Sequence, residues 1–293
     1  MIEYLQLAGA TLCSALLHTV GAFYNRKAHG KKNTNALYNM IYGVAVFLGW
    51  SVLFITDYSF DVKVLPYSLA FGIFYVLANW GLISALKTGS ALLTSLLCHL
   101  SLIAVSIWGF LFWNEPFTAL VAIGLALVTV AIFLCLYTGK PDKTVQKTKF
   151  SWKWLVYVAL AFFGNAGCTI VQRQQQRVFS YQHGNMLMFF ATLCSALVFV
   201  AMWLKTDKQD TRILIKSSGY LPAVAGIANI AMNLLVILLA SASLSASLVF
   251  PAMSVGALAL TTLFSVVALK ERLHWWQWLG IVLGAVAIVA LSV

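Results

Sequence analysis

Two pairs of polar residues stand one helical turn apart inside apolar stretches of the sequence. Tyr75 and Asn79 form the first pair, and Asn229 and Asn233 form the second. Residues four apart share a face of a helix, so each pair presents its polar groups together. Amide and hydroxyl groups deep in an apolar solvent face a protein interior or a cavity, because exposing them to lipid is costly. Such pairs can hydrogen-bond a solute, and contact between helices is the alternative role for each asparagine.

Three further residues extend this polar set. His18, His99 and Asn165 also fall inside apolar stretches, and Trp80 follows Asn79 directly. The two histidines titrate near neutral pH, so they are candidates for solute contact or for carrying a coupled proton. Trp80 is a candidate aromatic contact for a cationic solute, with a place at the membrane interface as the alternative. No Asp or Glu lies in the middle of an apolar stretch, which favours an uncharged site.

Such residues must be positioned by helices that cross a bilayer. Of the 293 residues, 61% are hydrophobic and 9% are charged, whereas soluble domains carry about 25% charged residues. A bilayer core requires about 20 apolar residues per helix. The sequence therefore predicts an all-α integral membrane protein with ten transmembrane helices, near residues 4–24, 36–55, 66–86, 90–112, 117–137, 152–172, 184–204, 219–240, 245–269 and 274–293.

The positive charges fall on one side of these helices. The net charge of +11 would suit a nucleic-acid partner, but all 19 Lys and Arg residues except Lys63, Arg173 and Arg177 fall in alternate connections. This is the positive-inside pattern of membrane proteins. We therefore expect both termini outside, the segment 138–150 in the cytoplasm, and no nucleic acid among the partners.

The cysteines and the known nucleotide motifs suggest no cofactor. The five cysteines all fall inside the expected helices, and none forms a CxxC pair that would indicate a metal site or a disulfide framework. The sequence contains no GxxxxGK[ST] loop, so ATP is not the expected energy source. We expect no metal, no other cofactor and no enzymatic activity.

The sequence contains an internal repeat. The stretches GIFYVLAN and GIANIAMN align so that Asn79 corresponds to Asn233 and Tyr75 to Asn229. A weaker match aligns HTVGAFYNR with NAGCTIVQR, so that His18 corresponds to Asn165. We expect a first repeat at 1–137, a linker at 138–150 and a second repeat at 151–293. Five helices per copy, an odd number, require the copies to lie inverted in the bilayer, as in secondary transporters with a site at the repeat interface.

Two glutamates also recur in the two copies. Glu115 and Glu271 each lie between two apolar stretches, and each precedes a glycine by nine positions. Pro116 suits the first turn of a helix. A carboxylate at that place interacts with the positive helix end, which contributes about 0.3–1 kcal/mol. We expect both glutamates to begin a helix, and a role in coupling is the alternative.

Two five-helix repeats, each with a glutamate before its last helix, resemble the EamA-type ten-helix branch of the drug/metabolite transporter superfamily. The resemblance covers the whole chain and implies a solute transporter. The sequence departs from the family at Asn114 and Lys270, where glycine often precedes the glutamate. It also departs in its first basic loop, which follows the first helix instead of preceding it.

The sequence thus predicts a secondary active transporter that works by alternating access in a cell membrane of the bacterial inner-membrane type. Its expected solutes are neutral or zwitterionic metabolites, such as amino acids or nucleobase-like compounds. Its other expected partners are the lipid bilayer and a proton or another coupling ion, and we expect a monomer or a weak homodimer. The alternatives are a drug or quaternary-ammonium (choline-like) carrier with an aromatic cage, and a lipid-handling membrane protein.

Overall fold

The computed structural model describes residues 2–28, 30–88, 91–136, 152–240, 244, 246–269 and 275–292, and every regular element in these ranges is helical. The helices are α1 Ile2–Lys27, α2 Thr34–Thr56, the 3₁₀ turn η1 Val62–Val64, α3 Leu65–Thr88, α4 Ala91–Phe112, α5 Ala119–Leu136, α6 Trp152–Val178, α7 Gly184–Leu204, α8 Thr211–Ser218, α9 Tyr220–Ala240, α10 Ala246–Leu269 and α11 Trp275–Ser292.

Each apolar stretch of the sequence forms a long helix. Within lipid a backbone can satisfy its polar groups only through bonds inside its own segment, which favours helices. By length and composition, α1, α2, α3, α6, α7 and α9 are six helices able to cross a membrane. Helices α4, α5, α10 and α11 hold apolar stretches of 10–17 residues within the described chain. The expected all-α membrane fold is confirmed at this level.

Contacts between helices come in pairs that relate the two halves of the chain. Helix α3 packs on α6, and α9, the counterpart of α3, packs on α1. In the same way α3–α7 matches α2–α9, and α4–α6 matches α1–α10. Helices α2 and α7, α4 and α10, and α5 and α11 each pack on their own counterpart. A two-fold relation between two repeats produces this pattern, and most of the packing joins one half to the other.

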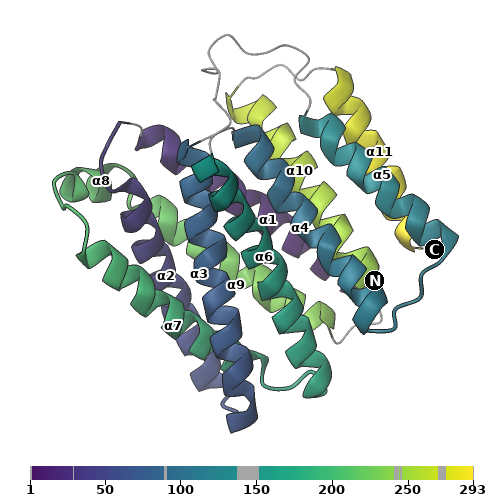
Figure 1. Cartoon of the computed structure of the whole chain (residues 1–293), viewed down its shortest axis with the longest axis horizontal. Helices are drawn as coiled ribbons and strands as arrows, with labels where there is room; N and C mark the ends of the chain where they lie inside the picture. The colour runs from purple at the N-terminus through teal and green to yellow at the C-terminus, as the bar shows by residue number, and fades with distance from the viewer. Residues whose placement is uncertain are drawn as a thin grey trace.

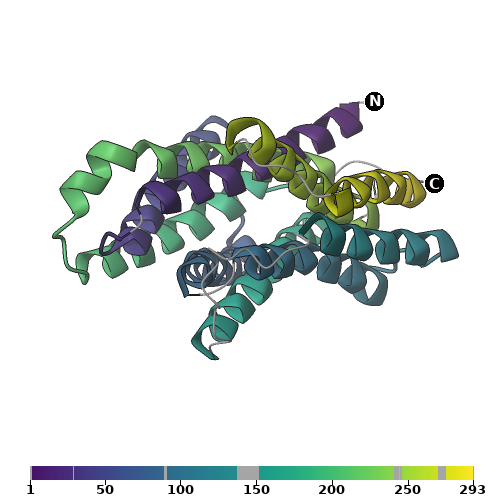
Figure 2. The same cartoon turned by 90° about the horizontal axis from the view of Figure 1, so that it is seen from above.

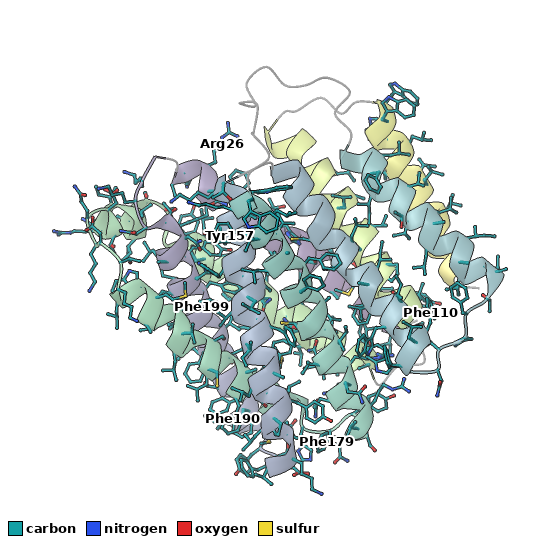
Figure 3. All side chains as sticks on the ribbon, viewed as in Figure 1. Arg26, Phe110, Tyr157, Phe179, Phe190 and Phe199 are labelled. Carbon is teal, nitrogen blue, oxygen red and sulfur yellow. The ribbon has the colours of Figure 1, made fainter. Side chains whose placement is uncertain are left out.

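Counterpart helices run in opposite directions. Helix α5 rises from the α4–α5 connection at the lower right of Figure 1, and α11 descends beside it toward the C-terminus. Helix α1 ends near Arg26 at the upper end of the molecule, whereas α6 ends beside Phe179 at the lower end (Figure 3). Both termini lie on the same side of the molecule in Figures 1 and 2. The two halves therefore lie inverted relative to each other.

Two glycines let α3 and α6 approach closely. A Cβ atom on Gly164 would lie 2.4 Å from the backbone nitrogen of Ala78, and one on Gly81 would lie 2.6 Å from the backbone nitrogen of Ala161. Small residues allow helix backbones to meet where lipid provides no hydrophobic drive between helices. This close contact fixes one wall of the site described below.

Helix α6 is longer than hydropathy predicts. It continues to Val178 instead of ending near residue 172, because the segment QRQQQR consists of good helix formers and can extend the helix. Arg173 and Arg177 therefore belong to a helix, although the charge pattern alone places them with the connections. Arg173 is 8% exposed.

Helix α8 is an element that the hydropathy pattern does not predict. It occupies the connection between α7 and α9, with Leu214 fully buried against the molecule and Arg212 and Lys216 exposed. Eight residues with this mixed pattern are too short and too polar for hydropathy to separate from a loop. The expected linker at 138–150 and the residue Glu271 lie outside the described residues.

Candidate functional site

A cavity of about 130 Å³ lies between the two halves of the molecule. Helices α1, α3, α6 and α9 contribute much of its wall, and they make two of the closest helix contacts in the fold, α3–α6 and α1–α9. Six residues singled out in the sequence line it: His18, Tyr75, Asn79, Asn165, Asn229 and Asn233.

The two repeats hold their asparagines by the same hydrogen bond. The Nδ2 of Asn79 donates to the carbonyl oxygen of Tyr75 at 2.9 Å, and the Nδ2 of Asn233 donates to the carbonyl oxygen of Asn229 at 3.0 Å. Bonds of this kind to the backbone one turn earlier fix the side chain against its own helix. Asn79 is half-buried and Asn233 is buried, so equivalent side chains occupy similar positions on inverted helices.

A hydrogen-bond network joins the halves across one wall of the cavity. The hydroxyl of Tyr75 lies 2.7 Å from the hydroxyl of Tyr42 and donates to Oδ1 of Asn229 at 3.1 Å. The same Oδ1 accepts a second bond from Nδ2 of Asn233, at 3.1 Å. Asn229 is therefore an acceptor shared by α3 and α9, and it is 5% exposed. The network fixes polar groups of both repeats around one space.

The third repeat-related pair contributes an imidazole and an amide. His18 lines the cavity from α1, and Asn165 lines it from α6. Nδ2 of Asn165 donates to Oγ of Ser101 at 2.6 Å, which connects α6 to α4. The cavity wall thus offers amide, hydroxyl and imidazole groups, and no carboxylate lies among its described lining residues.

Two of the candidate residues are not brought into this group. Trp80 packs edge to face on Tyr157, with ring centroids 5.6 Å apart, and it is not among the residues that line the cavity. Its position gives no support to an aromatic contact with a solute. His99 lies on α4, but its side chain belongs to the part of the chain that the structure does not describe.

Several lining residues are not singled out by the sequence patterns. Thr169 and Gln172 extend the cavity wall along α6 from Asn165. Their spacing of four and then three residues places them on one helix face, and this periodicity could have identified them. Tyr42 and Phe71 also line the cavity, and Tyr75 stacks on both rings at 6.1 and 5.9 Å. Nothing in the sequence separates these rings from ordinary buried aromatics.

The expected role of Glu115 at the start of a helix is wrong. Helix α5 begins at Ala119, and the side chain of Thr118 accepts the hydrogen bond from the backbone of Val121 that caps it. Asn114 has a positive φ of 54°, which a right-handed helix does not contain. Glu115 is the residue before Pro116, and a residue before proline avoids the helical region. The chain therefore turns back at this point, and the carboxyl group of Glu115 lies against Gly109 near the end of α4.

The comparison with protein families decides the identity of the chain. The model of the EamA-like transporter family matches residues 2–137 and 152–293, which together cover nearly the whole sequence. The chain belongs to the EamA-like transporter family. The expected kinship with the drug/metabolite transporter superfamily is thereby confirmed, and the match in two blocks agrees with the paired helix contacts. This EamA-like protein is a multi-pass membrane protein from a family of transporters rather than enzymes.

One solved structure, titled "Crystal structure of protein", shares the fold of this EamA-like chain. It is 15% identical, the alignment covers 97% of this chain and 95% of the other, and the TM-score is 0.69. At this identity the likeness concerns the fold alone. No curated protein matches the sequence.

Proposed function

We propose that this EamA-like protein moves small neutral or zwitterionic organic solutes by alternating access, with the solute site in the cavity between its halves. One observation carries this proposal: both copies of the repeated polar turn, 75–79 and 229–233, contribute to the wall of the same cavity. Inverted repeats hold the solute at their interface and expose it to each side in turn.

The groups around the cavity favour an uncharged solute of small size. Amides, hydroxyls and an imidazole can hydrogen-bond an amino acid or a nucleobase-like compound, and no carboxylate among the described lining residues balances a cation. Pockets for drug-sized ligands measure about 300–1,000 Å³, so a cavity of about 130 Å³ suits a smaller metabolite.

A quaternary-ammonium solute is the second candidate, because the rings of Tyr42, Phe71 and Tyr75 line the cavity. Aromatic faces attract such cations. Counterflow into proteoliposomes distinguishes the two classes: vesicles loaded with unlabelled amino acid, nucleobase or choline-like compound are offered the same compound in radiolabelled form. Accumulation of neutral or zwitterionic solutes supports the proposal, and accumulation of the choline-like compound alone overturns it.

The proposed topology has ten membrane spans in two inverted repeats, 1–137 and 151–293, joined by a cytoplasmic linker at 138–150. Both termini lie outside. In a cysteine-free background, a cysteine replacing Val62 in the η1 turn is expected to react with a membrane-impermeant reagent added to intact cells. A cysteine replacing Gln209 beside α8 is expected to remain unlabelled until the cells are opened. The reverse labelling pattern would show that the orientation is inverted.

His18 is the proposed site of proton coupling, since it lines the cavity and an imidazole changes charge near neutral pH. His18→Gln is expected to abolish the response of uptake to a pH gradient while counterflow of the same solute continues. Glutamine keeps a polar side chain but cannot accept a proton at these pH values. The measurement compares both assays over about pH 5.5–7.5, which is roughly one pH unit on each side of the ordinary pKa of histidine. An unchanged pH profile would remove His18 from the coupling step.

A further inference from the structure

The end of α6 is hydrogen-bonded to one connection from each half of the molecule. Arg173 follows Gln172, which lines the cavity, and its Nη2 donates to the carbonyl oxygen of Leu244 at 3.5 Å. One turn later, Nη2 of Arg177 donates to the carbonyl oxygen of Trp113 at 3.1 Å. Leu244 lies between α9 and α10, and Trp113 lies between α4 and α5. The last turns of α6 therefore connect both halves beside the cavity.

The α4–α5 connection also brings a negative charge to this place. Nε1 of Trp113 donates to Oε1 of Gln174 at 2.8 Å, and Glu115, two residues further along the same connection, brings its negative charge into the surroundings of Arg173. Trp113 is 4% exposed and Arg173 is 8% exposed. A buried guanidinium depends on such partners, because removing one partner leaves an uncompensated charge away from water.

Arg26, the counterpart of Arg173 in the first half, differs from it in exposure to solvent. The alignment of HTVGAFYNR with NAGCTIVQR pairs Arg26 with Arg173. Arg26 is exposed, and Figure 3 shows its side chain projecting from the upper end of the molecule, opposite the end where Phe179 follows α6. Equivalent arginines are thus covered at one end of the molecule and open at the other.

The covered end leaves some polar atoms unsatisfied. Nε of Arg173, Oε1 of Gln176 and Nδ1 of His183 are buried without a hydrogen-bond partner within the described chain. Buried polar atoms are normally paired, and each exception raises the free energy of the state that contains it. Opening of this end to water would give these atoms hydrogen-bond partners, which lowers the cost of an open arrangement.

We propose that Glu115 and Arg173 form a latch that closes this end of the cavity, and that the transport cycle releases it. The proposal rests on the proposed transport function, since it assigns one gate of that cycle. Glu115 comes from the first repeat and Arg173 from the second, so a relative movement of the halves separates their charges. The contact between Arg177 and Trp113 must part in the same movement.

The test measures access to the cavity rather than transport. A cysteine replacing Thr169, which lines the cavity one turn before Arg173, is introduced into a background without the five native cysteines. Vesicles are treated with a membrane-impermeant thiol reagent on the side from which a cysteine replacing Asp61 reacts. Asp61 marks the same end of the molecule, because its backbone nitrogen bonds to Met186 in the first turn of α7, which follows the end of α6. Glu115→Gln is expected to raise the labelling rate by about tenfold, within the usual range of conformational coupling.

Two controls make the result specific. Arg26→Gln removes the repeat-related arginine and is expected to leave the labelling rate unchanged. The exchanged pair Glu115→Arg with Arg173→Glu restores opposite charges and is expected to return slow labelling. An unchanged rate in Glu115→Gln, with a normal melting temperature, would overturn the latch, and so would an equal rise in Arg26→Gln. Because Glu115 is only half-buried, its variant is expected to fold even if Arg173→Gln does not.

The proposed function and the latch can fail separately. If no neutral or zwitterionic solute shows counterflow while the labelling rates behave as expected, the solute assignment falls and the latch stands. If such solutes are transported while the labelling rate stays unchanged in Glu115→Gln, the latch falls and the transport proposal stands.

Discussion

Asn229→Ala is expected to weaken solute binding by at least tenfold. Its Oδ1 accepts hydrogen bonds from the Tyr75 hydroxyl and from Nδ2 of Asn233. Its removal takes this shared acceptor from the cavity wall and leaves the Tyr75 hydroxyl only Tyr42, and Nδ2 of Asn233 only the Asn229 carbonyl, as partners. Each such loss costs about 1–3 kcal/mol, which corresponds to roughly tenfold to a hundredfold in affinity. Titration calorimetry on purified protein, with a solute identified by counterflow, measures the change.

Alanine variants of two other cavity asparagines and of one asparagine outside the cavity provide the comparison for this result. Asn79→Ala and Asn233→Ala are each expected to weaken binding by about tenfold to a hundredfold, since each removes one amide from the cavity wall. Asn35→Ala is the matched control, because Asn35 donates to Ser84 at 2.8 Å but does not line the cavity. If the dissociation constant is unchanged in all three cavity variants, these asparagines serve only as helix contacts.

Gly164→Val is expected to prevent the normal packing of α3 against α6. A Cβ atom at this position would lie 2.4 Å from the backbone nitrogen of Ala78 and 2.8 Å from its Cα. Backbone atoms cannot move aside as a flexible side chain can, so the helices must separate. Overpacking a core costs about 1–3 kcal/mol, and a clash between backbones belongs at or above the upper end of that range. The yield of monodisperse protein and the melting temperature are the quantities to measure, and both are expected to fall markedly.

Gly21→Ala provides the matched control for this prediction. Gly21 lies within α1, and a Cβ atom there would have the Tyr38 hydroxyl at 3.7 Å as its nearest neighbour, which is ordinary contact. Alanine also restricts the unfolded chain more than glycine does. We therefore expect an unchanged or slightly higher melting temperature. Equal destabilisation in both variants would show that the close approach of α3 and α6 is not the cause.

The helices and the central polar residues are predictable from the sequence, because both depend on simple physical regularities. Lipid requires long apolar segments, so hydropathy locates the long helices to within a few residues except at the end of α6, and it misses only the short helix α8 among the described α-helices. The internal repeat alone aligns Asn79 with Asn233, and the folded chain brings both to one cavity.

Other features depend on contacts that no local pattern contains. Glu115 has the sequence context of a helix start, but the positive φ of Asn114 and the cap at Thr118 leave it before the helix, with its carboxyl group against Gly109 near the end of α4. Hydropathy ends a segment at its first charges, even where a helix continues through them, and so it assigns Arg173 to a connection. The carbonyl oxygen to which buried Arg173 donates belongs to Leu244, which lies far away in the sequence.

The packing of helices from one half against helices from the other half limits when each contact can form during synthesis of the chain. A ribosome releases α3 before α6 and α5 before α11, yet these are the helices that pack together most closely. Helix α3 therefore leaves the ribosome shortly before its main partner α6, whereas α5 lacks its main partner until α11, the last described helix, is made. The packing of α5 can thus be completed only after the rest of the chain has been synthesised.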